Sequence, residues 1–104
     1  MIVVVGGHVY TTELEEFLTT HPDVRLAAVY GVRDQGNVER VHATVVLTPH
    51  STTTPDDLRT MVQTGRGAMY VPDHVDVVDA LPLTEVGKPD KKELRRRAAN
   101  RTKR

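Results

Sequence analysis

The sequence contains no cysteine, few aromatic residues and no long apolar run, and each absence excludes a class of chemistry. Without cysteine the chain can form no disulfide, no thiol nucleophile and no thiolate-bound metal site, and a reducing cytoplasm is the location that we expect. No apolar run approaches the roughly 20 residues that span a bilayer, so no transmembrane segment is expected. The start, Met1-Ile-Val-Val-Val5, lacks the basic region of a signal peptide and predicts a strand.

At 104 residues, the chain is long enough for one domain with one modest core. Its formal net charge is zero, but the segment from Lys91 to Arg104 holds eight lysines and arginines against one acid, Glu93. Such a segment binds phosphates or nucleic acid in some proteins and is a solvated terminus in others. Because no aromatic residue is interleaved with these charges, no nucleic-acid partner is expected. We predict that residues 98–104 form a disordered basic tail.

The spacing of apolar residues predicts short strands and helices. The predicted strands are 2–5, 24–32, 38–48 and 74–78, and the predicted helices begin near Thr12, near Pro55 and after Asp90. Thr12-Glu-Leu-Glu15 matches a capping box, and a polar turn between the two long strands favours an antiparallel pair. The predicted fold class is α+β: a small antiparallel sheet of about three strands, with an extra short N-terminal hairpin, flanked by helices.

A loop between the last strand and the basic helix carries Lys88. Pro82 should end the strand, and Gly87 can adopt a backbone conformation that is closed to other residues. Pro89 biases Lys88 towards an extended conformation. Asp90 is a good helix cap, with an acid three residues further on, as in a capping box. Spacing alone leaves two interpretations open: an exposed turn with a solvated lysine, or a loop that holds one ammonium between two fixed elements.

The histidines and glycines show no other catalytic pattern. No two histidines lie close together at helical spacing, and no carboxylate cluster flanks them, so no metal site is expected. The sequence contains no nucleophile elbow and no phosphate-binding glycine loop of the P-loop or dinucleotide type. The five histidines are His8, His21, His42, His50 and His74.

The segment around Lys88 resembles a known signature. Pro82-Leu-Thr-Glu-Val-Gly-Lys88, followed by Leu94-Arg95, resembles P-x-x-x-x-G-K, a C-terminal motif of adenylate-forming enzymes. This superfamily includes the acyl-CoA synthetases, the luciferases and the adenylation domains of peptide synthetases. Further segments resemble, in the same order, the acyl-CoA synthetase C-terminal domain (the AMP-binding enzyme C-terminal domain) over roughly residues 1 to 97. They are Met1–Tyr10, Glu13-Leu-Glu15, His21-Pro-Asp-Val24, 27–32, 39–41, 45–47, Tyr70-Val-Pro72 and 77–82.

A few positions depart from the family pattern. Thr11 stands where proline is usual, and Asn37-Val38 replaces a frequent Trp-Gly pair. Met69-Tyr70 stands where Tyr-Lys is usual, and Pro89 follows the lysine where an aliphatic residue is preferred. These departures indicate a divergent member or a narrower subgroup.

The resemblance implies that residues 1–97 are the mobile C-terminal domain of a larger acyl-CoA synthetase, with a large N-terminal adenylation domain in cis. Such an enzyme uses ATP, with Mg²⁺, to convert a carboxylic acid, here a fatty or related acid, into an acyl-adenylate and then into a CoA thioester. The domain rotates between the two half-reactions. By itself it is expected to bind no cofactor and no metal and to be inactive.

The resemblance also assigns site residues. Lys88 would be the catalytic lysine of adenylation, and Gly87 and Lys88 would form the ATP and acyl-adenylate loop. Gly6, Gly7 and His8 would line the CoA pantetheine channel. Two alternatives stay open: the C-terminal part of a peptide-synthetase-type adenylation domain that acts on a carrier protein, and a stand-alone, non-catalytic binding module with the same fold.

Overall fold

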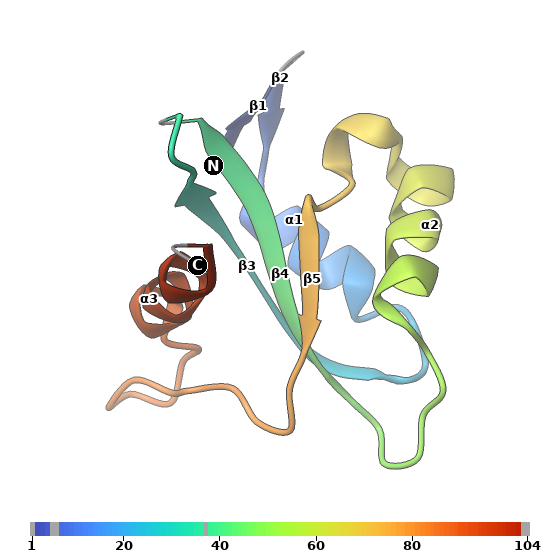
Figure 1. Cartoon of the computed structure of the whole chain (residues 1–104). Coiled ribbons are helices and arrows are strands. Elements are labelled where there is room, and N and C mark those ends of the chain that lie inside the picture. The colour runs from blue at the N-terminus through green and yellow to red at the C-terminus, as the bar shows by residue number, and fades with distance from the viewer. Residues whose placement is uncertain (1, 5–6, 37, 103–104) are drawn as a thin grey trace.

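The two longest strands, β3 (Val24–Arg33) and β4 (Glu39–Leu47), form an antiparallel pair at the centre of the fold (Figure 1). The computed structural model describes residues 2–4, 7–36 and 38–102 of the chain. A separate antiparallel hairpin is formed by β1 (Ile2–Val4) and β2 (Gly7–Val9). The predicted α+β class, the antiparallel pair and the N-terminal hairpin are confirmed.

The third strand of the sheet, β5 (His74–Val77), pairs with β4 in parallel, so the sheet is mixed rather than wholly antiparallel. Between these strands the chain passes through helix α2 (Pro55–Arg66) and a short 3₁₀ helix, η1 (Ala68–Tyr70). A crossover of this length returns the chain to the end of the sheet where β4 began, and the next strand then runs parallel.

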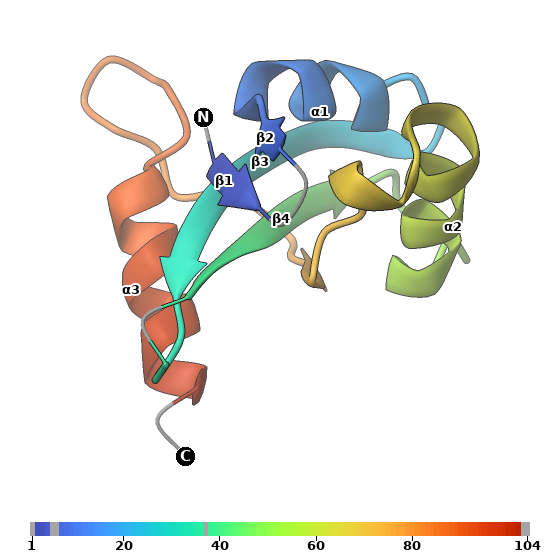
Figure 2. The same cartoon turned by 90° about the horizontal axis from the view of Figure 1, so that it is seen from above.

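Side chains alternate along β3 into two separate clusters of buried residues, as a strand with period two requires. Val29 packs with Leu14 of helix α1 (Thr11–Leu18) and with Leu58 of α2. Tyr30 faces the other way and packs with Leu94 of helix α3 (Lys91–Thr102). Figure 2 shows α2 and α3 on opposite sides of the β3–β4 pair. The central strands are thus covered by helices on both faces.

The starts of α2 and α1 differ in whether a side chain caps the helix. The Thr54 hydroxyl accepts the Asp57 N–H at 3.1 Å and the Asp57 carboxylate accepts the Thr54 N–H at 2.9 Å, so the start of α2 is a complete capping box. Helix α1, in contrast, begins at Thr11 with no side-chain cap. The capping box predicted over Thr12 to Glu15 does not form, because the helix begins one residue earlier with Tyr10 at the cap position. The Glu15 carboxylate binds elsewhere, as described below.

Helix α3 continues through Thr102, and the predicted start of the tail at residue 98 falls inside it. Leu94 and Ala98 lie one helical turn apart, and both are buried in the second cluster. The burial of Ala98 holds the helix against the sheet at the position where the basic tail is predicted to begin. Residues 103–104 lie outside the described residues.

Candidate functional site

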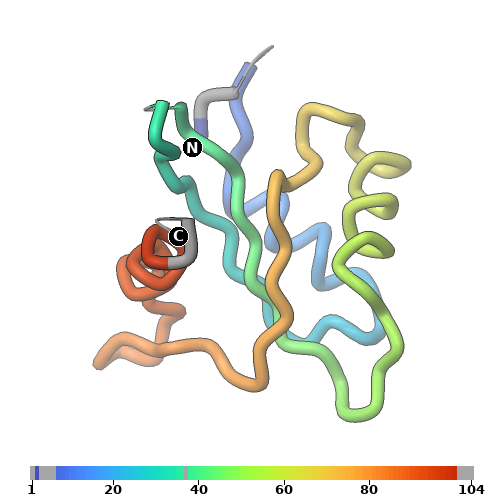
Figure 3. Tube along the Cα trace, viewed as in Figure 1, coloured from blue at the N-terminus to red at the C-terminus, as the bar shows by residue number. Residues whose placement is uncertain are grey.

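Lys88 lies on a short β-hairpin that connects the end of the sheet to α3 (Figure 3). The Thr84 N–H donates to the Lys88 carbonyl at 2.7 Å, and the Gly87 N–H donates to the Thr84 carbonyl at 2.9 Å. Gly87 has φ of +83°, in the left-handed region that a three-residue hairpin loop requires at this position. At the base of the hairpin, the Asp90 N–H donates to the Pro82 carbonyl at 2.8 Å. The predicted backbone role of Gly87 is therefore confirmed.

The hairpin fixes the main chain of Lys88 and leaves its side chain exposed. In addition to the carbonyl contact, the Lys88 N–H donates to the Thr84 hydroxyl at 3.3 Å. Within the described part of the chain, the Lys88 ammonium has no hydrogen-bond or ion-pair partner, and the residue is exposed. A cation held in this way can meet an anionic group that another domain or a substrate supplies.

Helix α3 begins directly after the hairpin and is capped by Asp90, whose carboxylate accepts the Glu93 N–H at 3.1 Å. Glu93 does not return the bond, because the Asp90 N–H is already held by the base of the hairpin. The Glu93 carboxylate instead accepts hydrogen bonds from Arg96 at 2.7 Å and from Arg97 at 3.0 Å. These two contacts, with Arg96 the stronger, lower the pKa of Glu93 to about 2. The lysine hairpin and the first turn of α3 thus form one hydrogen-bonded unit.

Glu15 joins this unit to the body of the domain. Its Oε2 accepts the buried Val29 N–H at 2.8 Å and lies 3.0 Å from Lys91 Nζ at the start of α3. One carboxylate therefore connects α1, β3 and the base of the hairpin. Sequence reasoning missed this role, because it placed Glu15 in a local capping box, and the only signal was an acid on the buried side of a short helix.

Strand β2, which carries the predicted pantetheine-channel residues Gly7 and His8, lies at the opposite end of the domain from the hairpin (Figure 1). Gly7 begins β2 and His8 is exposed on it, whereas Gly6 lies outside the described residues. A Cβ on Gly7 would lie 3.0 Å from the Met69 sulfur, so the missing side chain lets η1 pack against β2. The structure therefore does not bring Lys88 together with Gly7 and His8, but places them on two separate surfaces.

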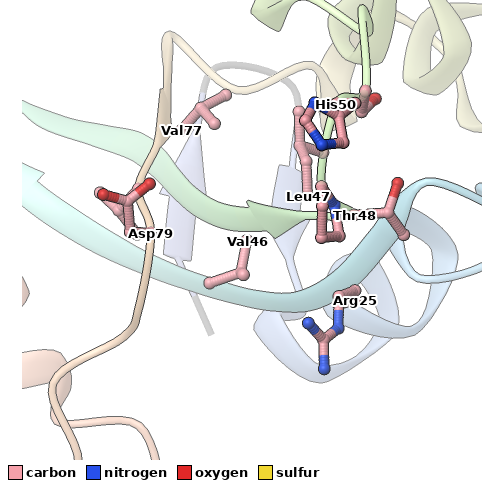
Figure 4. Close-up of a pocket in the computed structure, with 10 residues that line it drawn as sticks. Arg25, Val46, Leu47, Thr48, His50, Val77 and Asp79 are labelled. Carbon is pink, nitrogen blue, oxygen red and sulfur yellow. The ribbon is translucent and has the colours of Figure 1, made fainter.

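A depression of about 380 Å³ lies where β4 and β5 end (Figure 4). Its polar lining includes Arg25, His50 and Asp79. Figure 4 shows the Arg25 guanidinium pointing away from His50, so these side chains do not converge on one point. Among the described residues predicted for the site, none lines this depression.

Over residues 2–4, 7–36 and 38–102, no group of three or more histidine, aspartate and glutamate side chains is arranged to hold a metal ion. The described residues therefore offer no ligand cluster for the Mg²⁺ that accompanies ATP. Over the same ranges, no helix has the length and apolar character needed to cross a membrane.

Comparison with known proteins places this geometry in a family. Residues 13–88 match the model of the AMP-binding enzyme C-terminal domain. A medium/long-chain fatty-acid–CoA ligase of Mycobacterium tuberculosis is 38% identical over 104 residues, which cover 93% of this chain and 18% of the ligase. A fatty acid–[acyl-carrier-protein] ligase of Streptomyces coeruleorubidus is 36% identical over 96 residues, which cover 92% of this chain and 18% of that ligase.

A solved structure, the amide bond synthetase McbA of Marinactinospora thermotolerans, superposes with a TM-score of 0.85 at 42% identity and covers 91% of this chain and 19% of its own. This chain thus spans less than a fifth of the length of all three relatives. The family match ends at Lys88, the residue that the hairpin displays. The chain belongs to the family of AMP-binding enzyme C-terminal domains, which are the C-terminal domains of larger adenylate-forming enzymes.

Proposed function

We propose that this chain is the mobile C-terminal domain of a fatty-acid–CoA ligase and that Lys88 is its adenylation lysine. The observation that carries the proposal is an exposed ammonium on a hydrogen-bonded hairpin at the end of the family match. The large N-terminal domain, in cis, supplies the ATP site and the acyl pocket. This division agrees with the small share of its relatives that the chain spans.

In the first half-reaction, a carboxylate oxygen of the acid attacks the α-phosphorus of ATP, and pyrophosphate leaves with the electrons of the broken P–O bond. The product is an acyl-adenylate. Negative charge is concentrated between the carboxylate and the α-phosphate in the transition state, and a positioned ammonium lowers this barrier electrostatically. Lys88 is suited to this task because its backbone is held by Thr84 and its ammonium is exposed.

In the second half-reaction, the CoA thiol attacks the acyl carbonyl carbon, its proton is lost and AMP leaves. The family resemblance implies that the domain rotates between the half-reactions, which withdraws Lys88 and presents the edge with Gly6, Gly7 and His8. The position of the hairpin and β2 at opposite ends of the domain supports this proposal, because one rotation about a hinge can exchange them.

The proposed acceptor is CoA, since the segments around Val9-Tyr10 and His21-Pro22 resemble the CoA ligases. A carrier protein is the second candidate, and the Streptomyces relative, a fatty acid–[acyl-carrier-protein] ligase, favours it. Incubating one preparation with acyl-adenylate and either CoA or a phosphopantetheinylated carrier protein separates the two. If a thioester forms on the carrier protein but not on CoA, the acceptor is the carrier protein.

The test of Lys88 uses the longer protein that contains this chain, or a chimera in which the chain replaces the C-terminal domain of the mycobacterial relative. We expect Lys88→Ala to slow ATP–pyrophosphate exchange by about 10²–10³-fold, the usual loss for one well-placed electrostatic donor. Thioester formation from supplied acyl-adenylate should stay close to wild type. Lys88→Arg should rescue only in part, because the planar guanidinium is bulkier than an ammonium and is hydrated differently.

Lys92→Ala is the matched control, because Lys92 is also an exposed lysine but lies on α3. It should leave both half-reactions unchanged. Equal losses in both half-reactions for Lys88→Ala would indicate a structural role, and no loss in either would make Lys88 a solvated turn lysine. The 104-residue chain alone should show no exchange, and exchange by the pure chain would contradict the need for a second domain.

A further inference from the structure

We propose that Leu83 and Val86 are apolar anchors that seat the lysine hairpin against the large N-terminal domain, an inference that rests on the proposed function. Both side chains are strongly exposed, Leu83 at 58% and Val86 at 79%. Leu83 lies on the strand before the loop of the lysine hairpin, and Val86 lies within the loop. Val86 is the most exposed large apolar residue among those whose exposure the structure describes. The two anchors and the cation are thus gathered within six consecutive positions.

Local structure does not explain these two residues. The tip of a hairpin favours glycine, asparagine, aspartate and serine, whose side chains are compatible with the turn and with water. Val86 lies inside the three-residue loop, where backbone hydrogen bonds and the left-handed Gly87 already set the conformation. Leu83 follows Pro82 on the first strand of the hairpin and is exposed, whereas Leu81, two residues earlier, is buried in the core. Neither side chain belongs to the buried clusters of this domain, so both are available to a surface outside it.

The occupant that covers the anchors is the large domain in cis. The chain spans 18% of the mycobacterial relative, so most of such an enzyme lies outside it and is available as a docking surface. Single exposed apolar residues are common on protein surfaces, but a pair beside a functional cation is the arrangement of a small interface core. Apolar contact around Lys88 would exclude water, and an ammonium acts more strongly on a developing charge in a dry cleft. Leu83 and Val86 are accordingly positioning residues, and Lys88 is the group that touches the reacting atoms.

The hairpin is already ordered before docking, which limits the entropy lost when it binds. Three backbone hydrogen bonds between 82 and 90 hold it in one conformation, and Asp90 continues directly into the capped helix α3. The anchors therefore approach the partner surface on a rigid support. We expect their replacement to weaken seating without changing the fold of the domain.

The experiment measures both half-reactions of the longer protein, or of the chimera, for Leu83→Ser and Val86→Ser. Each should slow ATP–pyrophosphate exchange by about 10-fold, the loss expected when one such side chain stays in water rather than being buried. Thioester formation from supplied acyl-adenylate should be unchanged, because the hairpin is withdrawn in that step. Leu26→Ser and Val77→Ser are the matched controls, with exposed fractions of 49% and 45% on β3 and β5, and they should leave exchange unchanged.

A second measurement distinguishes this inference from the proposed function. If the anchors act by placing Lys88, then Val86→Ser should cause almost no further loss of exchange in a Lys88→Ala background. A full 10-fold further loss, or equal losses for Val86→Ser and Val77→Ser, would overturn the anchor role while leaving the catalytic role of Lys88 intact. A Lys88→Ala variant that retains wild-type ATP–pyrophosphate exchange would overturn the proposed function itself. Self-association of the 104-residue chain that Val86→Ser abolishes would make a second copy, rather than the large domain, the occupant.

Discussion

Replacing Gly87 by alanine tests whether the left-handed backbone at this position maintains the lysine hairpin. Gly87 has φ of +83°, and a Cβ there would meet no heavy atom within 4 Å, so the cost of the substitution is backbone strain and not a clash. An ordinary L-residue in this region costs about 1–2 kcal/mol. This strain should shift the equilibrium between closed and open hairpin towards the open form by about 5- to 30-fold.

The assay is amide hydrogen exchange of the 104-residue chain, followed at the Thr84 and Asp90 amides. These amides donate to the Lys88 and Pro82 carbonyls at 2.7 and 2.8 Å, so they report opening of the hairpin directly. We expect Gly87→Ala to accelerate their exchange by the same 5- to 30-fold factor, about 1–2 kcal/mol. Gly87→Asn should accelerate exchange less, because asparagine enters the left-handed region more readily than alanine.

Gly67→Ala provides the control for strain elsewhere. Gly67 has φ of +95° at the end of α2, and a Cβ there also meets no atom within 4 Å. Its replacement should destabilise the end of that helix while leaving exchange at Thr84 and Asp90 unchanged. Equal acceleration of the hairpin amides by both variants, or no acceleration by Gly87→Ala, would refute the conclusion that Gly87 maintains the hairpin.

Two further predictions concern the carboxylates around the base of the hairpin. Glu15→Ala should lower the free energy of unfolding by about 1–3 kcal/mol, because the buried Val29 N–H loses its acceptor, whereas Lys91→Ala should cost less than about 1 kcal/mol. If urea unfolding shows equal losses of unfolding free energy for the two variants, the stabilisation comes from the ion pair with Lys91 and not from the hydrogen bond to Val29. For Glu93, the folded pKa of about 2 lies below the ordinary value of 4.5, so its stabilisation is complete above about pH 4.5 and is lost as the pH falls towards 2. Glu93→Gln should therefore flatten the decline of the unfolding midpoint over this window, and parallel curves for variant and wild type would contradict the assignment.

Features that depend on neighbouring residues could be predicted from the sequence. Gly87 in the left-handed region, Asp90 as the cap of α3 and the Thr54 start of α2 all rest on interactions within about four positions. The antiparallel β3–β4 pair follows from one polar turn between two apolar runs. The lysine motif could also be identified from the sequence, because the resemblance of the ordered segments depends only on residue order and spacing.

Contacts between distant segments decided the rest. The parallel direction of β5 depends on where α2 packs, and the length of α3 depends on the burial of Ala98 against the sheet. Glu15 matches a local cap, yet it binds Val29 and Lys91, because the tertiary fold brings a buried amide and an ammonium to one carboxylate. The sequence by itself determined which residue the hairpin displays. Only the tertiary structure decided that Lys88 and Gly7 lie at opposite ends of one domain, since their separation depends on how the whole sheet and its helices pack.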